Sequence, residues 1–292
     1  MALSKWTFIV DAADKDLRLD QIIAARTDLS RRQAREALKL GGVQVARKRV
    51  KVAGRSVAPG TEVRVAFDPD LAPPPVMEIP IVFEDAWLLA VNKPAGLPTQ
   101  GTWATDRHDL QAMLKLQRPE LKLFLHHRLD QGTSGLLLFA KDAAANAGLT
   151  AQFSGHTLQK VYLARVSEPL APCAVDLPIG RLRHADPGRF ACEGDLIEPR
   201  HAHTTFRPAA EAEAAPLLPG HWVIAEPATG RTHQIRVHLQ SLGRPIVGDA
   251  LYGGSRNDQL WLHAWKLALK HPISGEALAL EAPPLRFLKE PR

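Results

Sequence analysis

The sequence contains few cysteines and no long apolar run. Its two cysteines, Cys173 and Cys192, stand among 292 residues and are too few for the disulfide framework of a small secreted domain. No apolar stretch approaches the roughly 20 residues that cross a bilayer. The residues Met1 to Trp6 lack a cationic segment followed by an apolar stretch, so we expect no signal peptide. These absences predict a cytoplasmic protein without membrane segments.

The composition is that of a folded globular protein. Apolar residues make up 45% of the chain and charged residues 23%, which is ordinary for a globular domain and argues against disorder. The length allows a sizeable core, arranged as one large domain or as two unequal ones.

Positive charge is concentrated near the N-terminus. Residues 1–67 contain 14 Lys and Arg against 7 Asp and Glu, a net charge of +7, whereas the whole chain carries +6. The remaining residues therefore carry a net charge of −1. This asymmetry favours a nucleic-acid-binding module joined to a nearly neutral body. The alternative is a basic domain that is merely soluble.

A proline-rich segment coincides with the change in charge. Five prolines fall within residues 67–80, and consecutive prolines cannot continue a helix or a central strand. We interpret residues 68–80 as a semi-rigid linker. The sequence thus predicts an N-terminal domain over residues 1–67 and a second domain over residues 81–292.

A basic helix is predicted in the N-terminal domain. Ser30 and Gln33 have the spacing of a capping box, and the helix should end near Leu40, before two glycines. Some of its basic residues are spaced i, i+4 and i+8 and should share one face. The candidate RNA-binding residues of this domain are Arg31, Arg32, Arg35, Lys39, Arg47 and Lys48.

This region resembles the S4 RNA-binding domain from about Leu17 to Phe67. Short alternating strands at 43–45 and 63–65 follow the basic helix. The chain departs from the family at the hairpin, where Val45-Ala46-Arg47 replaces the usual Val-Asn-Gly. An ordinary small α+β domain with a solvated basic helix is the alternative.

The most informative motif is His127-Arg-Leu-Asp-Gln-Gly-Thr-Ser-Gly135. Five apolar residues, 136–140, follow it at once and predict a buried strand. Asp130 should therefore lie at the mouth of a core strand, where a rigid scaffold can direct it into a cleft. Taken alone, the motif is also compatible with a surface turn that carries a solvated Asp–Arg pair.

The motif resembles the active-site sequence of the RluA-type pseudouridine synthases. Other segments resemble the same family in the expected order, namely Asn92–Leu97, Lys160-x-Tyr162, Thr229–His238 and Gly243–Asp249. Several ordered matches are more specific than one short motif. The resemblance covers about residues 80–285 and implies an α+β fold, with a mixed, mainly antiparallel sheet and a central catalytic cleft.

The resemblance also implies roles for individual residues. Asp130 would act as nucleophile or base in converting uridine to pseudouridine, without metal or cofactor. Arg236 would pair with this carboxylate, and Tyr162 would offer its ring to the uracil and its hydroxyl to proton transfer. Arg128 would fill the space that an extruded uridine leaves. The expected partner is RNA, large-subunit ribosomal RNA before tRNA, and we expect a monomer with no protein partner.

Three competing functions follow from the same residues. A serine hydrolase built on Ser134 would need His127 and Asp130 on one short turn, which is too tight for a triad. A zinc site could use Cys173, Cys192, His201 and His203, but their spacing fits no standard pattern. The third is a non-catalytic RNA-binding protein, which would not require an aspartate, a tyrosine and an arginine together.

Overall fold

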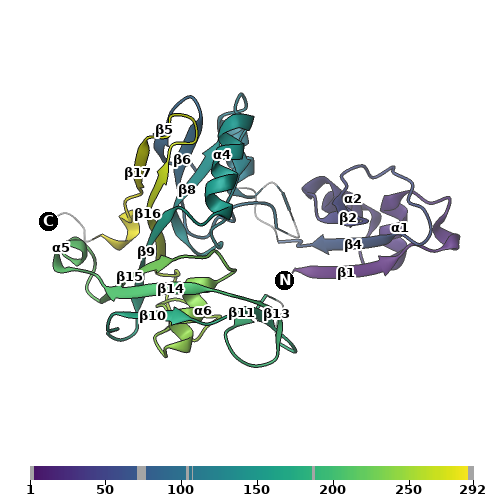
Figure 1. Ribbon diagram of the computed structural model, residues 1–292. Coiled ribbons are helices and arrows are strands. Elements are labelled where there is room, and N and C mark those ends of the chain that lie inside the picture. Colours follow the sequence, from purple (N-terminus) through teal and green to yellow (C-terminus); the bar gives the residue numbers. More distant parts are fainter. Residues whose placement is uncertain (1–2, 71–76, 103–104, 107, 186–187, 289–292) are drawn as a thin grey trace. The chain divides into compact units, whose positions relative to one another are not determined.

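The computed structural model describes residues 3–70, 77–102, 105–106, 108–185 and 188–288 (Figure 1). The chain divides into two compact units. The first comprises Met1–Glu78 together with Gln100–Pro119, and the second Ile79–Thr99 together with Glu120–Arg292. Residues 71–76 of the expected linker lie outside the described part of the chain.

The first unit is a four-stranded antiparallel sheet with helices, in the order β1-β4-β2-β3. Its elements are β1 (Ser4–Ile9), a short 3-10 helix (Ala12–Asp14), α1 (Leu19–Arg26), α2 (Arg31–Leu40), β2 (Val43–Val45), β3 (Lys48–Arg49), β4 (Glu62–Phe67) and α3 (Leu110–Gln117). Its core joins Ile22 and Ile23 of α1, Leu38 of α2, and valines of β2 and β4. The apolar faces of the helices and the sheet therefore cover each other.

The basic helix is confirmed as α2, with the expected ends. Ser30 Oγ accepts a bond from the Gln33 backbone N–H at 3.3 Å, and Gln33 Oε1 accepts one from the Ser30 N–H at 2.9 Å. Gly41 ends the helix with φ of 85°, a left-handed conformation that glycine adopts without steric cost. Helix α3 begins at Leu110, because the Asp109 side chain caps it by accepting a bond from the Ala112 N–H at 3.0 Å.

The hairpin between β2 and β3 turns on two non-glycine residues in left-handed conformation. Ala46 has φ of 48° and Arg47 has φ of 64°, and the flanking residues Val45 and Lys48 pair across the strands. Tight hairpins of this kind usually carry Asn-Gly. The turn still forms with Ala-Arg, and it exposes Arg47 and Lys48 at its end.

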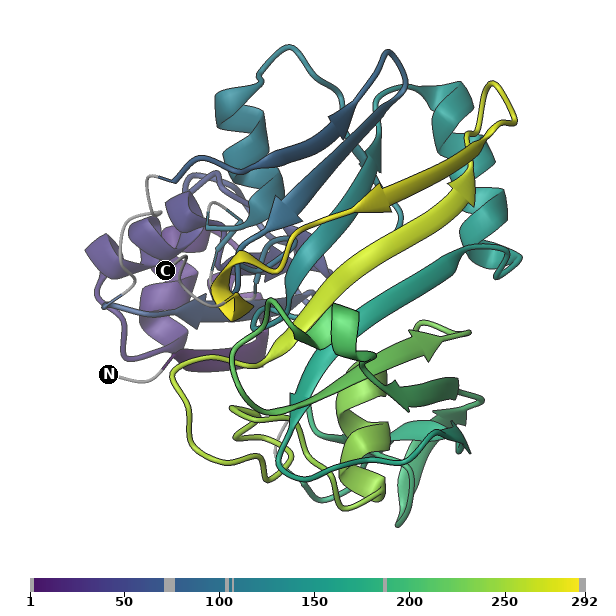
Figure 2. The ribbon, with the colours of Figure 1, turned by 90° about the vertical axis from the view of Figure 1, so that its left-hand side faces the viewer.

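The second unit is built on a ten-stranded sheet and a separate three-stranded one (Figure 2). Its strands are β5 (Ile81–Glu84), β6 (Leu88–Lys93), β7 (Phe124–Leu125), β8 (Ser134–Ala140), β9 (Gln159–Val166), β10 (Cys173–Asp176), β11 (Ile179–Leu182), β12 (Phe190–Ala191), β13 (Leu196–Arg200), β14 (His203–Pro208), β15 (His221–Pro227), β16 (Leu262–Lys270) and β17 (Ala277–Glu281). Its helices are α4 (Ala143–Ser154), α5 (Glu211–Ala214), α6 (Gln234–Ser241) and a final 3-10 helix (Leu285–Phe287).

The large sheet has the order β10-β14-β15-β9-β16-β8-β6-β5, with β17 beside β16 and β7 beside β8. Its pairs are antiparallel except β8 with β16, which run parallel. Helix α4 packs on β8, and α6 packs on β14 and β15. The expected α+β fold with a mixed, mainly antiparallel sheet is confirmed.

Strand β8 is the buried strand that the sequence predicts. Residues 135–140 are all buried, because β6 and β16 flank the strand and α4 packs on it. At its start, Gly135 has φ of 113°, and a Cβ atom there would overlap the backbone of Ala264 in β16. The glycine of the motif therefore permits the parallel pairing that fixes the turn before it.

Among the described residues, no helix combines the length and apolar character needed to span a membrane.

Candidate functional site

A buried lysine anchors the turn that carries Asp130. Lys93, at the end of β6, is fully buried, and its Nζ donates to the carbonyl oxygens of Leu97 at 2.7 Å and Gln131 at 3.3 Å. Burial lowers the pKa of Lys93 to about 7, although the charge of Asp130 opposes this shift. One side chain thus ties the loop after β6 to the residue that follows Asp130.

Backbone and side-chain bonds complete this anchorage. Thr99 Oγ1 donates to the Leu129 carbonyl at 2.8 Å and accepts from the Leu129 N–H at 3.1 Å. Gly96 and Gln131 are joined by two further bonds, of 2.8 Å and 3.0 Å. The turn closes on itself through the Thr133 N–H and the Asp130 carbonyl, at 3.1 Å. Asp130 therefore projects from a turn that is held on both sides.

Arg236 of α6 joins Asp130 to a second carboxylate. Its Nη1 lies 3.1 Å from Asp130 Oδ2, while its Nε and Nη2 lie 2.7 Å and 2.9 Å from the two oxygens of Asp249. The side chain of Asp249 is 1% exposed and that of Asp130 is 27% exposed. Burial alone would lower the pKa of Arg236, but the bonds and charges of both aspartates raise it on balance.

His233 lies on the other side of Asp130. Its Nε2 is 3.8 Å from Asp130 Oδ2, and its Nδ1 is 2.8 Å from the hydroxyl of Tyr252. Burial lowers the pKa of His233, against an opposing effect of Asp130. The hydroxyl of Tyr252 also accepts the Phe190 N–H at 3.2 Å, so Tyr252 links His233 to the backbone of β12.

The loop before α6 is organised by a buried glutamine. Gln234 Oε1 accepts bonds from the Thr229 hydroxyl and the Arg231 N–H, and its Nε2 donates to the His203 carbonyl. Helix α6 begins only at Gln234, after this network. The preceding residues form a loop instead, with His233 left-handed at φ of 57°.

Tyr162 and Arg128 lie near the same turn. Tyr162 is in β9 opposite Ala264 of β16, and burial, with the charge of Asp130, raises its pKa. Its hydroxyl therefore stays protonated at neutral pH, and it has no hydrogen-bond partner in the described part of the chain. Arg128, two residues before Asp130, is exposed.

The six candidate RNA-binding residues of the first unit fall into two groups. Arg35 lies 2.7 Å and Arg31 3.7 Å from the fully buried carboxylate of Asp20. Burial would raise the pKa of Asp20, but the neighbouring arginines lower it on balance. The second group is exposed and makes no ion pair within the described residues; it comprises Arg32, Lys39, Arg47 and Lys48.

The residues of the competing functions are placed differently. Ser134 pairs with His263 at 2.8 Å, but His263 is buried and its Nε2 faces the Ala282 carbonyl at 3.0 Å. His263 thus links strands, and its second ring nitrogen faces a backbone carbonyl where a triad would place a carboxylate. His201 and His203 lie beside Asp176 at 2.9 Å and 3.7 Å. Among the described residues, no group of three or more His, Cys, Asp or Glu has the geometry of a metal site.

Comparison with known proteins identifies the family. The sequence model of the RNA pseudouridylate synthases matches residues 87–241, which include Asp130, Tyr162 and Arg236. The chain belongs to the RNA pseudouridylate synthase family. The S4 domain matches residues 17–63 of this pseudouridine synthase, so the basic first unit contains an S4 domain.

Named relatives and a solved structure support the assignment. The synthase is 36% identical to tRNA pseudouridine synthase C of Salmonella typhi, over 69% of this chain and 84% of the relative. It is also 36% identical to ribosomal large subunit pseudouridine synthase C of Pasteurella multocida, over 71% of this chain and 65% of the relative. The solved structure of human RNA pseudouridylate synthase domain containing 1 matches with a TM-score of 0.60 and 28% identity, over 73% of this chain and 86% of that one.

Four residues of the site received no role from sequence reasoning, namely Lys93, His233, Asp249 and Tyr252. The first three fall inside the quoted motifs, which was the available signal. Tyr252 falls outside them, and only its contacts with His233 and Arg236 reveal it.

Proposed function

We propose that this pseudouridine synthase isomerises specific uridines in structured RNA, with Asp130 as the catalytic group and no cofactor. The observation that carries the proposal is the geometry around Asp130. One of its oxygens is held by Arg236, and the other receives no hydrogen bond from the described residues. The carboxylate is thus oriented, yet partly open to a substrate.

The reaction requires little beyond these groups. The N1–C1′ bond of uridine breaks, the base rotates, and C5 bonds to C1′; C5 loses a proton and N1 gains one, so the mass is unchanged. Asp130 can attack an electrophilic carbon of the nucleotide or remove a ribose proton. Both routes need a carboxylate anion, and the guanidinium of Arg236 stabilises negative charge beside it.

The tyrosine and the exposed arginine have supporting roles. The ring of Tyr162 offers a flat surface to the uracil, and its protonated hydroxyl can donate or relay a proton. A paired uridine must leave its helix before C1′ is accessible, which costs a few kcal/mol. Arg128 is exposed next to the turn and fills the vacated space.

The N-terminal domain, residues 1–67, docks on RNA through its exposed cations, and residues 68–80 link it to the synthase domain. Arg31 and Arg35, which pair with Asp20, contribute positive charge to this contact. The exposed residues Arg32, Lys39, Arg47 and Lys48 contribute the rest. The resemblance to synthases that carry an S4 domain implies large-subunit ribosomal RNA before tRNA as the target. We therefore propose large-subunit ribosomal RNA as the target.

A map of pseudouridine across cellular RNA tests the proposal. Carbodiimide adducts that survive alkali should appear at defined uridines of large-subunit ribosomal RNA in cells with the protein. They should be absent in cells without it and in cells with Asp130→Asn. Sites confined to tRNA would overturn the target, and an unchanged map would overturn the catalytic function in favour of RNA binding alone.

A further inference from the structure

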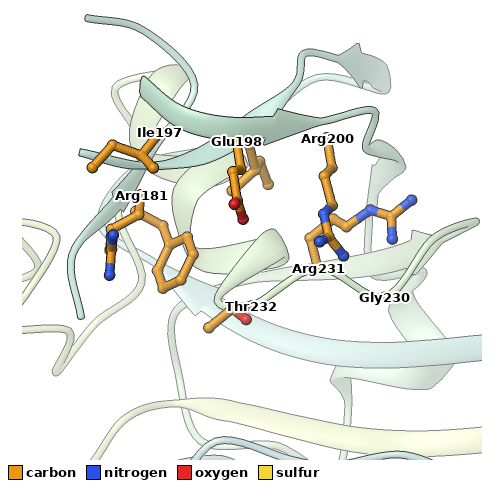
Figure 3. Close-up of a pocket in the computed structure, with 9 residues that line it drawn as sticks. Arg181, Ile197, Glu198, Arg200, Gly230, Arg231 and Thr232 are labelled. Carbon is orange, nitrogen blue, oxygen red and sulfur yellow. The ribbon is translucent and has the colours of Figure 1, made fainter. Parts of the chain in front are cut away.

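A cavity of about 350 Å³ lies between the three-stranded sheet and the loop before α6 (Figure 3). This volume is within the range of small-ligand sites, roughly 300–1,000 Å³. Side chains of β11, β12 and β13 form one wall, and Gly230, Arg231 and Thr232 form the other. The cavity therefore ends one residue before His233, which lies beside Asp130.

Three charged side chains at this cavity have no partner of their own. Figure 3 shows the carboxylate of Glu198 pointing into the cavity between Arg181 and Arg200. Within the described residues, none of the three makes an ion pair or a side-chain hydrogen bond. Arg231 differs, because its Nε donates to the His201 carbonyl at 2.8 Å. Glu198, Arg181 and Arg200 are all exposed, so their hydrogen-bonding capacity is open to a ligand that displaces solvent.

A bulge in β13 directs Glu198 into the cavity. The pairing register shifts between Ile179 and Arg181, and Glu198 has φ of 49°, a conformation uncommon outside glycine. Gly180 permits the bulge, because a Cβ atom there would lie 2.9 Å from Leu196 Cβ. Bulges redirect side chains and are frequent beside active sites.

An aromatic ring connects this cavity to the catalytic turn. Phe190 lines the cavity, and its ring lies edge-on to His233 with centroids 5.7 Å apart. The backbone N–H of Phe190 also donates to the hydroxyl of Tyr252. A group stacked on Phe190 would therefore adjoin the residues that flank Asp130.

We propose that this cavity binds a guanosine of the RNA close to the target uridine. The base stacks on Phe190, as bases do on aromatic platforms, and the flanking phosphates contact Arg181 and Arg200. Glu198 accepts hydrogen bonds from N1–H and N2–H of guanine, the base edge that offers two adjacent donors to a carboxylate. This inference rests on the proposed function, since it assumes an RNA substrate at Asp130.

Binding of short oligonucleotides to the full-length protein tests the site without isomerisation. The probes are fluorescein-labelled octauridylate and versions with one guanosine, inosine or adenosine at each position. Guanosine at one position should tighten binding about tenfold, as for one bidentate base contact. Inosine, which lacks the 2-amino group, should retain part of the gain, and adenosine none.

Variants assign the effect to named side chains. Glu198→Gln should remove the guanosine preference without weakening octauridylate binding. Arg200→Gln should weaken every probe and reduce the salt slope by about one phosphate equivalent. The matched control is Arg183→Gln, because Arg183 lies just beyond β11 and pairs with Asp195 at 2.8 Å; it removes the same charge and should change neither property.

Equal affinity for all probes, or a guanosine preference that survives in Glu198→Gln, would overturn the inference. The outcome is separable from that of the proposed function. Absence of a guanosine preference in the wild-type protein would overturn this inference and leave the proposed isomerisation untouched, whereas a protein without isomerase activity could still show the preference.

Discussion

Arg236 divides its guanidinium between Asp130 and Asp249. One nitrogen lies 3.1 Å from Asp130, and the two others form the fork on Asp249 at 2.7 Å and 2.9 Å. The buried Asp249 thus fixes the arginine, and the partly exposed Asp130 receives a single hydrogen bond. Had the fork faced Asp130, both of its oxygens would be engaged and fewer lone pairs would be free to react.

Asp130→Asn should abolish isomerisation and leave RNA affinity nearly unchanged. The amide keeps the shape of the side chain and removes its charge and basicity. We expect the rate to fall by roughly 10³-fold or more, as for loss of a catalytic carboxylate. Single-turnover assays with saturating protein measure the rate, and filter binding measures the affinity. Appreciable turnover by the variant would remove Asp130 from the catalytic role.

Arg236→Ala should lower both activity and stability, and Arg236→Lys should lower activity less. Removing the arginine leaves Asp249 as a buried, unpaired charge, which destabilises the fold by about 3–5 kcal/mol. Lysine restores charge without the fork. The double variant Arg236→Ala, Asp249→Ala should recover stability in urea melts and remain inactive. A double variant with wild-type rate would show that Arg236 serves folding alone.

Gly135→Ala should destabilise the protein by roughly 2–4 kcal/mol, through overlap with the Ala264 backbone and a strained positive φ. Gly96→Ala is the matched control, since Gly96 has φ of 86° and open space around its Cα. Gly96→Ala should lower the free energy of unfolding by only about 1–2 kcal/mol, which is the cost of the positive φ alone. Chemical unfolding of both variants gives the comparison. Equal losses of stability in the two variants would mean that the close approach of β8 to β16 adds nothing to the cost of Gly135→Ala.

The free energy of unfolding should fall as the pH is lowered from about 6.5 to about 4. Burial lowers the pKa of His263 to about 4, so the unfolded chain binds its proton first. Lowering the pH through this window therefore favours unfolding, by roughly 3 kcal/mol for this one group. His263→Gln should reduce this pH dependence, to which His127 also contributes because burial lowers its pKa to about 3. His221→Asn, at an exposed position, should not reduce it. A dependence unchanged in His263→Gln would contradict the assignment.

Replacement of Lys39, Arg47 and Lys48 by Gln should weaken RNA binding and leave stability unchanged. Each contact with a phosphate contributes about 0.7–0.9 to the slope of log K against log salt, so three lost contacts should reduce the slope by about 2–3. Arg35→Ala should behave differently and destabilise the domain, because Arg35 holds the buried Asp20 at 2.7 Å. An unchanged salt slope in the triple variant would exclude this surface from RNA contact.

Local features of the fold could be predicted from the sequence because they depend on bonds between residues that are close together in the chain. The capping box of Ser30 and Gln33 and the glycine after Leu40 set the ends of α2 through contacts within a few residues. The apolar run 136–140 identified β8 for a similar reason, since a strand buried on both faces needs no polar residue. The ordered motifs indicated the family, and the family resemblance predicted that Arg236 would contact Asp130.

Tertiary structure decided which of these groups meet. Arg236 and Asp130 are 106 positions apart and meet where helix α6 approaches the turn before β8. Ser134 and His263 are 129 positions apart and meet through the register of β8 and β16. No local pattern in the sequence showed that Asp249 is the principal partner of Arg236 or that Tyr252 contacts His233. Nor did any local pattern show which basic residues of the first unit pair with Asp20. A sequence motif specifies side-chain chemistry and short-range bonds, whereas the division of one guanidinium between two carboxylates depends on where distant strands and loops converge.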